Sequence, residues 1–382
     1  TFFRYRESPR EKWLSFGGWI NAVIPVLIVP YYSVIGGWVI KYLVEYFRGN
    51  AKLLAEDGYF TDFISNGVST ELCFVAFCAF TLIIIFAGVQ NGIERVSKIM
   101  MPILIVLSVI IAVYSVTRPG AFAGVKYFLV PNVKNFSWMT VVSAMGQMFY
   151  SLSIAMGILI TFGSYMKKDT AIEDSTRNVE IFDTGIAIMA GLMIIPAVFA
   201  FSGGDPDTLQ AGPSLMFITI PKVFQNMGFG TVIGIVFFLL VLFAAVTSSI
   251  ALTESAVSTF EDELGWGRKK ATVLVGVIML ALGSLSSLGY GPLAGIKIIG
   301  MQFLDLFDFL TNSVMMPIAA LITSLLVSRV VGIDKIEEEI IHGESAFRRK
   351  KVFVVMIKYL CPVFAIIILL SSVANALGWI KM

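Results

Sequence analysis

Residues 143–166 read SAMGQMFYSLSIAMGILITFGSYM, and this stretch decides how the rest of the chain is interpreted. It is long enough to cross a bilayer, which needs about 20 apolar residues. Yet its first half places Gln147, Ser151, Ser153 and Gly157 among large apolar side chains. Two interpretations are open. The stretch is either a packed helix whose serines bond to their own backbone, or a helix that breaks inside the membrane and exposes carbonyls and amides to an ion and a zwitterion.

The composition predicts a polytopic membrane protein. Of 382 residues, 57% are hydrophobic and 14% are charged, whereas soluble domains carry roughly 25% charged residues. The net charge of +2 gives no reason to expect a nucleic-acid partner. The one histidine, His342, lies in a polar loop, and the three cysteines lie in apolar stretches, where cysteine behaves as a small hydrophobe. We therefore expect no enzyme and no catalytic residues.

Nine apolar stretches are candidate membrane spans of a single domain. They cover about 17–47, 70–90, 99–117, 137–166, 180–202, 229–260, 271–288, 303–331 and 352–378. Lys and Arg favour one side by about two to one, which predicts a cytoplasmic N-terminus and an external C-terminus. The external segment 203–228 is apolar enough to fold back as a lid. The chain opens with Thr1 in a stretch typical of a cytoplasmic loop, so we expect further sequence upstream.

Polar groups inside the spans are candidates for function. A carboxylate within a span costs roughly 2.5–3.5 kcal/mol, and Asp183, Glu254 and Asp308 lie in or at the ends of spans. Asp183 and Asp308 could equally reach headgroups from a span end, whereas Glu254 lies deeper and should pair inside the bundle.

A second cluster lies in the sixth span. Ala244, Thr247 and Ser248 are spaced to share one helix face, where a carbonyl and two hydroxyls could meet a monovalent cation. Small residues at this spacing also serve plain helix packing.

Six segments then match a known family in order. They are PYYSVIGGW at 30–38, NGIERVSKIMMP at 91–102, GQMFYSLSIAMGILITFGSY at 146–165, GPSLMFITIP at 212–221, FAAVTSSIALTESAVSTFEDE at 243–263 and FDFLTNSVMMP at 307–317. The chain resembles the neurotransmitter:sodium symporters, especially the bacterial amino-acid type, from its first residue to its last. The resemblance implies an all-α membrane protein with the inverted-repeat transporter fold and discontinuous helices. The nine spans look like family helices three to eleven, with the first two helices and half of each site lacking.

The resemblance also assigns residues. It implies a substrate site made of Ile28, Tyr32, Tyr150, Ser153, Met156 and Leu252. It implies two sodium sites, one with Ser151 and Asp183 and the other with Ala244, Thr247 and Ser248. Asp308 matches an outer-gate acid and Asp262 a cytoplasmic-gate acid, and both should lack their arginine partners. Ala155 stands where glycine is usual, which predicts a tighter break or a smaller pocket.

The implied function is sodium-coupled import of an amino acid or related zwitterion across the plasma membrane (the inner membrane of a bacterium) by alternating access. Asp183 stands where many members have asparagine, and Ala187 replaces a chloride-site group, whereas Gln147 remains at a chloride-site position. We therefore expect chloride independence. The partners would be the substrate and the lipid bilayer, and a homo-oligomer is left open. The alternative is a truncated remnant or interaction subunit of the same fold that does not transport.

Overall fold

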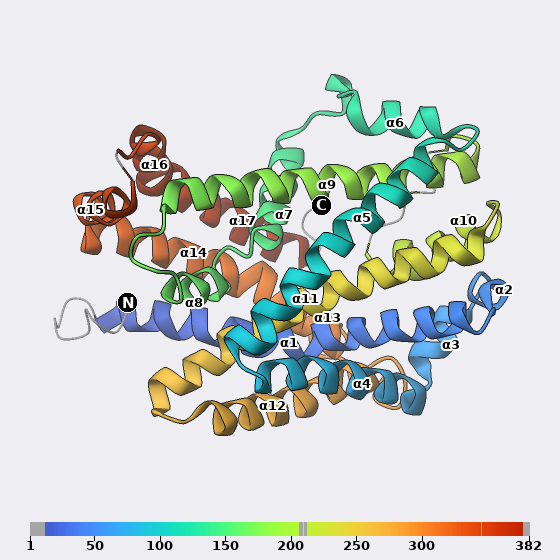
Figure 1. Cartoon of the computed structure of the whole chain (residues 1–382), viewed down its shortest axis with the longest axis horizontal. Coiled ribbons are helices and arrows are strands. Elements are labelled where there is room, and N and C mark those ends of the chain that lie inside the picture. The colour runs from blue at the N-terminus through green and yellow to red at the C-terminus, as the bar shows by residue number, and fades with distance from the viewer. Residues whose placement is uncertain (1–11, 206–208, 210–211, 345, 377–382) are drawn as a thin grey trace.

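The computed structural model describes residues 12–205, 209, 212–344 and 346–376, and most of them are helical (Figure 1). Both chain ends and parts of the expected lid, 206–208 and 210–211, lie outside the described residues. The α-helices are α1 (Lys12–Phe47), α2 (Ala51–Leu54), α3 (Tyr59–Ser65), α4 (Gly67–Phe86), α5 (Arg95–Val116), α6 (Ala121–Leu129), α7 (Trp138–Ser151), α8 (Ile158–Ser164), α9 (Ile172–Ser202), α10 (Ile220–Gln225), α11 (Gly230–Leu264), α12 (Arg268–Leu288), α13 (Phe303–Asp308), α14 (Met316–Leu325), α15 (Ile333–Gly343), α16 (Lys350–Val355) and α17 (Cys361–Ala376).

Short non-α segments join several of these helices. The π-helical segments are η2 (Val89–Glu94), η5 (Leu215–Thr219), η6 (Phe309–Met315), η7 (Leu326–Val331) and η8 (Met356–Leu360), and η3 (Val133–Asn135) is a 3-10 turn. Most π segments run directly into an α-helix. Thus η6 joins α13 to α14, and η7 extends α14, so that Phe303–Val331 is one continuous helical span.

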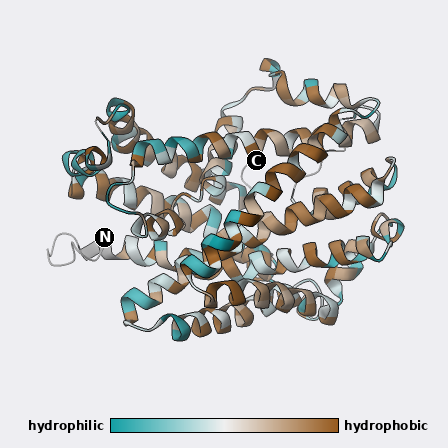
Figure 2. Ribbon diagram, viewed as in Figure 1, coloured by the Kyte–Doolittle hydropathy of each residue, from teal (hydrophilic) through white to brown (hydrophobic). Residues whose placement is uncertain are grey.

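Within the described residues, eight helices are long and apolar enough to cross a membrane. They are Phe16–Phe47, Gly67–Phe86, Val89–Val116, Ile172–Ser202, Gly230–Leu264, Arg268–Leu288, Phe303–Val331 and Lys350–Ala376. Their middle parts are hydrophobic (Figure 2). A helix satisfies its backbone hydrogen bonds internally, which is what a hydrocarbon environment demands.

The remaining expected span, 137–166, is divided. Its halves are α7, with 14 residues, and α8, with 7 residues. Neither half spans a bilayer alone, since a span needs about 20 residues. The count of nine spans therefore stays a prediction, whereas the discontinuity in this stretch is a feature of the structure.

The core is built around α1. Two-thirds of its span, 67%, is buried, against 11% for the last span, Lys350–Ala376. In Figure 1, α1 and α11 run side by side through the middle of the molecule, and α4 and α12 cover one flank. Gly37 lets α1 and α4 approach closely, because a Cβ there would lie 2.7 Å from the backbone nitrogen of Phe74. Small residues at such crossings are how helices pack in membranes.

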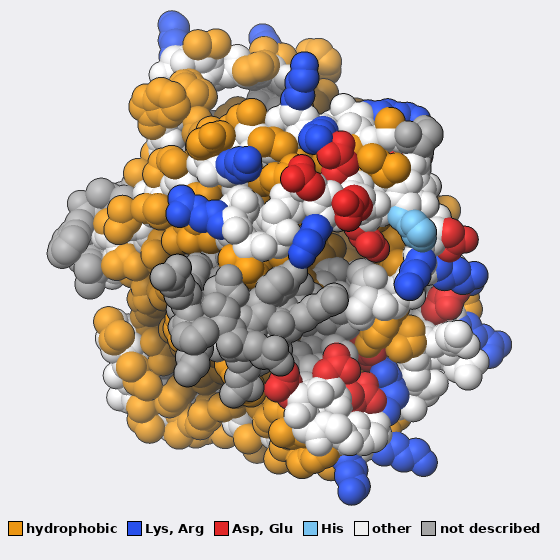
Figure 3. All heavy atoms as spheres, turned by 90° about the vertical axis from the view of Figure 1, so that its left-hand side faces the viewer, with side chains coloured by type: hydrophobic (Ala, Val, Ile, Leu, Met, Phe, Trp, Pro, Cys, Tyr) orange, Lys and Arg blue, Asp and Glu red, His pale blue; other side chains and the backbone are white. Residues whose placement is uncertain are grey.

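Charged and hydrophobic side chains lie on different parts of the surface. Figure 3 looks along the helices onto the end that carries α15 and α16, where Lys, Arg, Asp and Glu side chains gather. Hydrophobic side chains cover much of the flanks in the same view. A charged end and apolar flanks are the pattern expected of helices that enter and leave a bilayer.

The segment after α9 folds back onto the protein. Phe217 of η5 is buried against the rings of Trp38, Tyr42, Phe60 and Phe238, with centroids 5.1–6.2 Å away. The Tyr42 hydroxyl donates to the Phe217 carbonyl at 2.7 Å. These contacts fix the described part of 203–228 as a packed element.

A surface ion pair also ties this segment to α2–α3. Lys222 of α10 donates to the Asp57 carboxylate. The hydrogen bond and the charge of Lys222 lower the pKa of Asp57. Because Asp57 is exposed, this pair contributes little compared with the aromatic contacts.

Candidate substrate and ion site

The break between α7 and α8 is the centre of the site. After Ser151 the backbone leaves the helix, and Ser153 and Ala155 adopt φ angles of 53° and 61°. This left-handed region costs a residue with a side chain roughly 1–2 kcal/mol. Such strain persists only where the surroundings enforce it, and it is typical of functional sites.

Gly157 shows what enforces the break. It begins α8 with φ of 75°, which glycine adopts at little cost. A Cβ at this position would lie 2.9 Å from the carbonyl oxygen of Asn21 on α1 and 2.9 Å from the hydroxyl of Ser255 on α11. The end of the break is therefore wedged between the two central helices.

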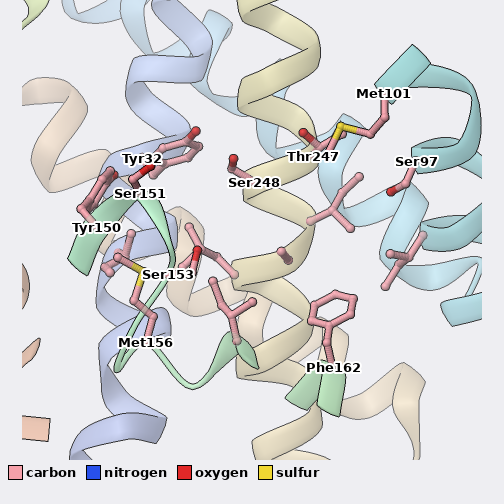
Figure 4. A pocket seen from close by; sticks show the side chains of 16 residues that line it. Tyr32, Ser97, Met101, Tyr150, Ser151, Ser153, Met156, Phe162, Thr247 and Ser248 are labelled. Carbon is pink, nitrogen blue, oxygen red and sulfur yellow. The ribbon is translucent and has the colours of Figure 1, made fainter. Parts of the chain in front are cut away.

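A cavity of about 500 Å³ lies beside the break. Its walls come from α1, the end of α7, the break, α8, α11 and the η2–α5 segment. The lining residues are Ile28, Tyr32, Ile93, Ser97, Met101, Tyr150, Ser151, Ser153, Met156, Ile158, Phe162, Thr247, Ser248, Ile250, Ala251 and Leu252 (Figure 4). All six predicted substrate residues and three of the five predicted sodium residues line this one cavity. The structure therefore brings together positions that are more than 200 residues apart in the chain.

The predicted substrate residues divide into polar and apolar groups. In Figure 4 the Tyr32 hydroxyl of α1 points toward Ser248 of α11, and Tyr150 and Ser151 lie at the start of the break. Ile28 and Leu252 are buried and supply apolar wall. A concave site with an apolar lining and a few convergent polar groups is the usual form of a small-molecule site.

The first predicted sodium pair is in contact. The Ser151 hydroxyl donates to Asp183 Oδ1 at 2.6 Å, although the residues are 32 positions apart. Asp183 comes from α9, so α9 is joined here to the last residue of α7. A carboxylate and a hydroxyl beside the open end of a helix are oxygen ligands of the kind that hard cations take.

The second predicted sodium group lies on α11. The Thr247 hydroxyl bonds to the carbonyls of Phe243 and Ala244, each at 3.0 Å. The Ala244 carbonyl, one of the predicted ligands, therefore already accepts a hydrogen bond from a side chain of its own helix. Since the Thr247 hydroxyl donates its proton there, its lone pairs stay available to a cation.

The two predicted gate acids lie apart from the cavity wall. Asp262 lines a separate cavity of about 300 Å³ with Asn21, Gly157 and Ser255, toward the end of α11. Asp308 has a partner, because Asn312 donates to its Oδ1 at 2.6 Å. This donor is an amide one turn along the same helix, and none of the ion pairs among the described residues includes Asp308, so the expected lack of an arginine partner stays a prediction.

Several cavity residues were not anticipated. Ser97 and Met101 lie on the far side of Thr247 from the break (Figure 4). Both lie in the segment NGIERVSKIMMP, and their spacing of four residues places them on one face of α5. Phe162 of α8 reaches the same cavity.

An ion pair between Glu254 and Arg268 joins α11 to α12 inside the bundle. Arg268 of α12 binds both carboxylate oxygens of Glu254, at 2.9 and 2.5 Å, and the Tyr165 hydroxyl donates to Glu254 at 2.7 Å. Arg268 also donates to the carbonyl of Ile85, the penultimate residue of α4, at 3.1 Å. Glu254 therefore pairs inside the bundle as predicted.

A polytopic membrane protein with a broken helix against a small central cavity has the architecture of a secondary transporter. Comparison with known proteins makes the assignment specific. Residues 60–379 match the Sodium:neurotransmitter symporter family. The chain belongs to this family, and its fold is the inverted-repeat, discontinuous-helix fold expected from the sequence.

Similar proteins support the same family assignment. The uncharacterized sodium-dependent transporter YhdH of Bacillus subtilis is 33% identical over 372 residues, covering 96% of this chain and 81% of that protein. An uncharacterized sodium-dependent transporter of Haemophilus influenzae is 30% identical over 373 residues, covering 95% and 80%. The crystal structure of MhsT in complex with L-phenylalanine is similar with a TM-score of 0.82 and 32% identity, covering 96% of this chain and 82% of that one. The two bacterial relatives are named as sodium-dependent transporters, and the family is one of symporters and not of enzymes.

Proposed function

We propose that this protein imports an amino acid across the plasma membrane, coupled to inward sodium flow, by alternating access. The observation that carries the proposal is the single cavity shared by the 152–157 break, Tyr32 of α1 and the hydroxyls of Thr247 and Ser248 on α11. A zwitterion and a cation need oxygen ligands and backbone dipoles close together, and the break provides both. Sodium bound beside a substrate carboxylate raises the affinity for substrate, and the coupling is reciprocal.

For the substrate, Tyr32 would donate its hydroxyl to the carboxylate and Tyr150 would cover the bound molecule. Ser153 and Met156 would lie beside the amine and the side chain, with Ile28 and Leu252 as apolar walls. These walls favour an apolar side chain, and the similar protein MhsT was crystallised with L-phenylalanine. L-phenylalanine is therefore the first substrate to test.

For sodium, one ion would be held by Ser151 and Asp183 and a second by Ala244, Thr247 and Ser248. The 2.6 Å contact between Ser151 and Asp183 fits two ligands of one small cation. The neutral oxygens of α11 fit a monovalent ion, which needs few carboxylates.

Asp183 also bears on chloride. A fixed carboxylate beside the first sodium would supply the negative charge that a chloride ion supplies elsewhere, and Ala187 offers no hydroxyl to hold chloride. We expect uptake to be unchanged when gluconate replaces chloride. Uptake that disappears without chloride would refute this part of the proposal.

The remaining elements fit a gated path. The 203–228 segment would act as an external lid, Asp308 as part of the outer gate and Asp262 as part of the cytoplasmic gate. From the bias of Lys and Arg, the N-terminus would lie in the cytoplasm and the C-terminus outside. A homo-oligomer is compatible with this arrangement but is not needed for it.

Substrate binding tests the site directly. Purified protein, expressed from its complete gene, should bind labelled L-phenylalanine in sodium and not in equal potassium. Tyr32→Phe should weaken binding about tenfold, because the substrate carboxylate loses a charge-assisted hydrogen bond. Tyr127→Phe, on the exposed side of α6, is the matched control and should bind normally. Equal binding by the Tyr32 variant and the control would remove Tyr32 from the site.

A further inference from the structure

A second groove lies on the flank of the protein, away from the substrate cavity. It has a volume of about 510 Å³ and runs between the N-terminal end of α4 and the residues after α12. Val68, Leu72 and Val75 form its α4 side, and Leu288 and Pro292 form the opposite side. Glu71 is the only charged residue in its lining.

The Glu71 carboxylate is only half satisfied. Its Oε1 accepts a hydrogen bond from the Ser284 hydroxyl of α12 at 2.5 Å. Its Oε2 is buried and has no hydrogen-bond partner among the described residues. None of the ion pairs in the described part of the chain includes Glu71. An unmatched carboxylate oxygen away from water is costly, so this position calls for a cationic donor.

The groove opens on an exposed apolar side of α4, near the start of that helix. The α4 side chains along it are exposed, Val68 by 75% and Leu72 by 67%, on a helix apolar enough to span a bilayer. Glu71 is four residues into α4, hence about 6 Å from the helix start at 1.5 Å per residue. The headgroup layer is about 5–7 Å thick on each side. If α4 begins at the membrane surface, the carboxylate lies near the boundary of headgroups and hydrocarbon.

We propose that this groove is a binding site for a membrane lipid with a primary ammonium headgroup, of the phosphatidylethanolamine type. The ammonium would bond to the Glu71 carboxylate after Oε2 turns out of its buried position toward the groove, and an acyl chain would lie along Leu72 and Val75. The charge of the groove selects the headgroup: an anionic lipid is repelled by the carboxylate, and the quaternary ammonium of a choline lipid has no N–H to donate. The site is independent of the proposed transport function.

The test is lipid retention by the purified protein, measured by native mass spectrometry after incubation with equal phosphatidylethanolamine and phosphatidylcholine. The wild type should retain the ethanolamine lipid at least fivefold over the choline lipid. Glu71→Gln should bring that ratio close to one, because the charge-assisted hydrogen bond is lost. Glu339→Gln, an exposed glutamate on α15, is the matched control and should keep the wild-type ratio.

Two further variants separate the headgroup from the groove. Leu288→Trp should fill the groove and reduce retention of both lipids. Ser284→Ala keeps the charge and frees Oε1, so it should retain the ethanolamine lipid at least as well as the wild type. It also serves if Glu71→Gln does not fold. The proposal would be overturned if the wild type retained both lipids equally, or if Glu71→Gln left the ratio unchanged. It would also be overturned if Leu288→Trp dissociated a dimer without affecting lipid retention, because a second copy of the chain would then occupy the groove.

Discussion

At the scale of single residues, the break between α7 and α8 depends on backbone conformations that are unfavourable for residues with a side chain. Ser153, Ala155 and Gly157 all have positive φ, and only one of them is glycine. The run SLSIAMG contains one glycine. The polarity of the stretch leaves a packed and a broken helix open, and the family resemblance favours the break. The strained geometry at Ser153 and Ala155 is not evident from the residue types. That geometry follows from the contacts of α1 and α11, which lie far away in the chain.

Gly157→Ala should lower stability by about 2 kcal/mol or more. The substitution combines a disfavoured φ with a Cβ placed 2.9 Å from two oxygen atoms. The measurement is the apparent melting temperature of the purified protein in detergent. Gly146→Ala in α7 is the control, because open space surrounds that glycine and alanine favours a helix there. Equal melting temperatures for the two variants would show that the break does not need glycine.

Ser248→Ala should weaken the sodium dependence of uptake. Removing one hydroxyl ligand should raise the sodium concentration for half-maximal activation about threefold or more, with little change at saturating sodium. Ser143→Ala, exposed on α7, should leave sodium activation unchanged. Unchanged activation in Ser248→Ala would exclude this residue from a sodium site.

At the scale of elements, an ion pair and an aromatic cluster each join several helices of the bundle. The Glu254–Arg268 pair joins α11 to α12 and, through the Ile85 carbonyl, to α4. The depth of Glu254 in its span predicts a partner, but not which arginine, because the turn between α11 and α12 decides which basic residue folds back. Phe217 joins the segment after α9 to α1, α3 and α11.

Arg268→Ala should destabilise the protein by about 3 kcal/mol, because it leaves the fully buried Glu254 carboxylate without its cation. Unfolding in a denaturing detergent, followed by circular dichroism, measures the loss. The neighbouring Lys269→Ala removes a charge at an exposed position and should stay close to the wild type. If both variants unfold alike, the pair contributes nothing beyond a surface ion pair.

Phe217→Ala should loosen the segment between α9 and α11. Truncating a buried phenylalanine costs about 3–5 kcal/mol where the contacts are intact. Hydrogen exchange of residues 212–225 should rise in the variant, and in Phe122→Ala, exposed on α6, it should not. Unchanged exchange would mean that the aromatic contacts do not hold this segment.

At the scale of the whole molecule, the fold class follows from the sequence, because long apolar stretches admit little but helices in a membrane. Membership of the symporter family is confirmed by the match over residues 60–379. The groove that contains Glu71 could not be predicted, since it requires the pairing of α4 with α12, which are about 200 positions apart. The partner of Asp308 was missed for a different reason: an asparagine one turn away lies within local reach but carries no special signal.

The most direct test of sodium-coupled import is uptake into liposomes. The protein, expressed from its complete gene, is reconstituted and given labelled L-phenylalanine with an inward sodium gradient or with equal potassium on both sides. We predict accumulation above the external concentration in sodium only, abolished when sodium is equalised across the membrane. Equal uptake with sodium and potassium, or uptake that never exceeds equilibration, would contradict sodium-coupled symport.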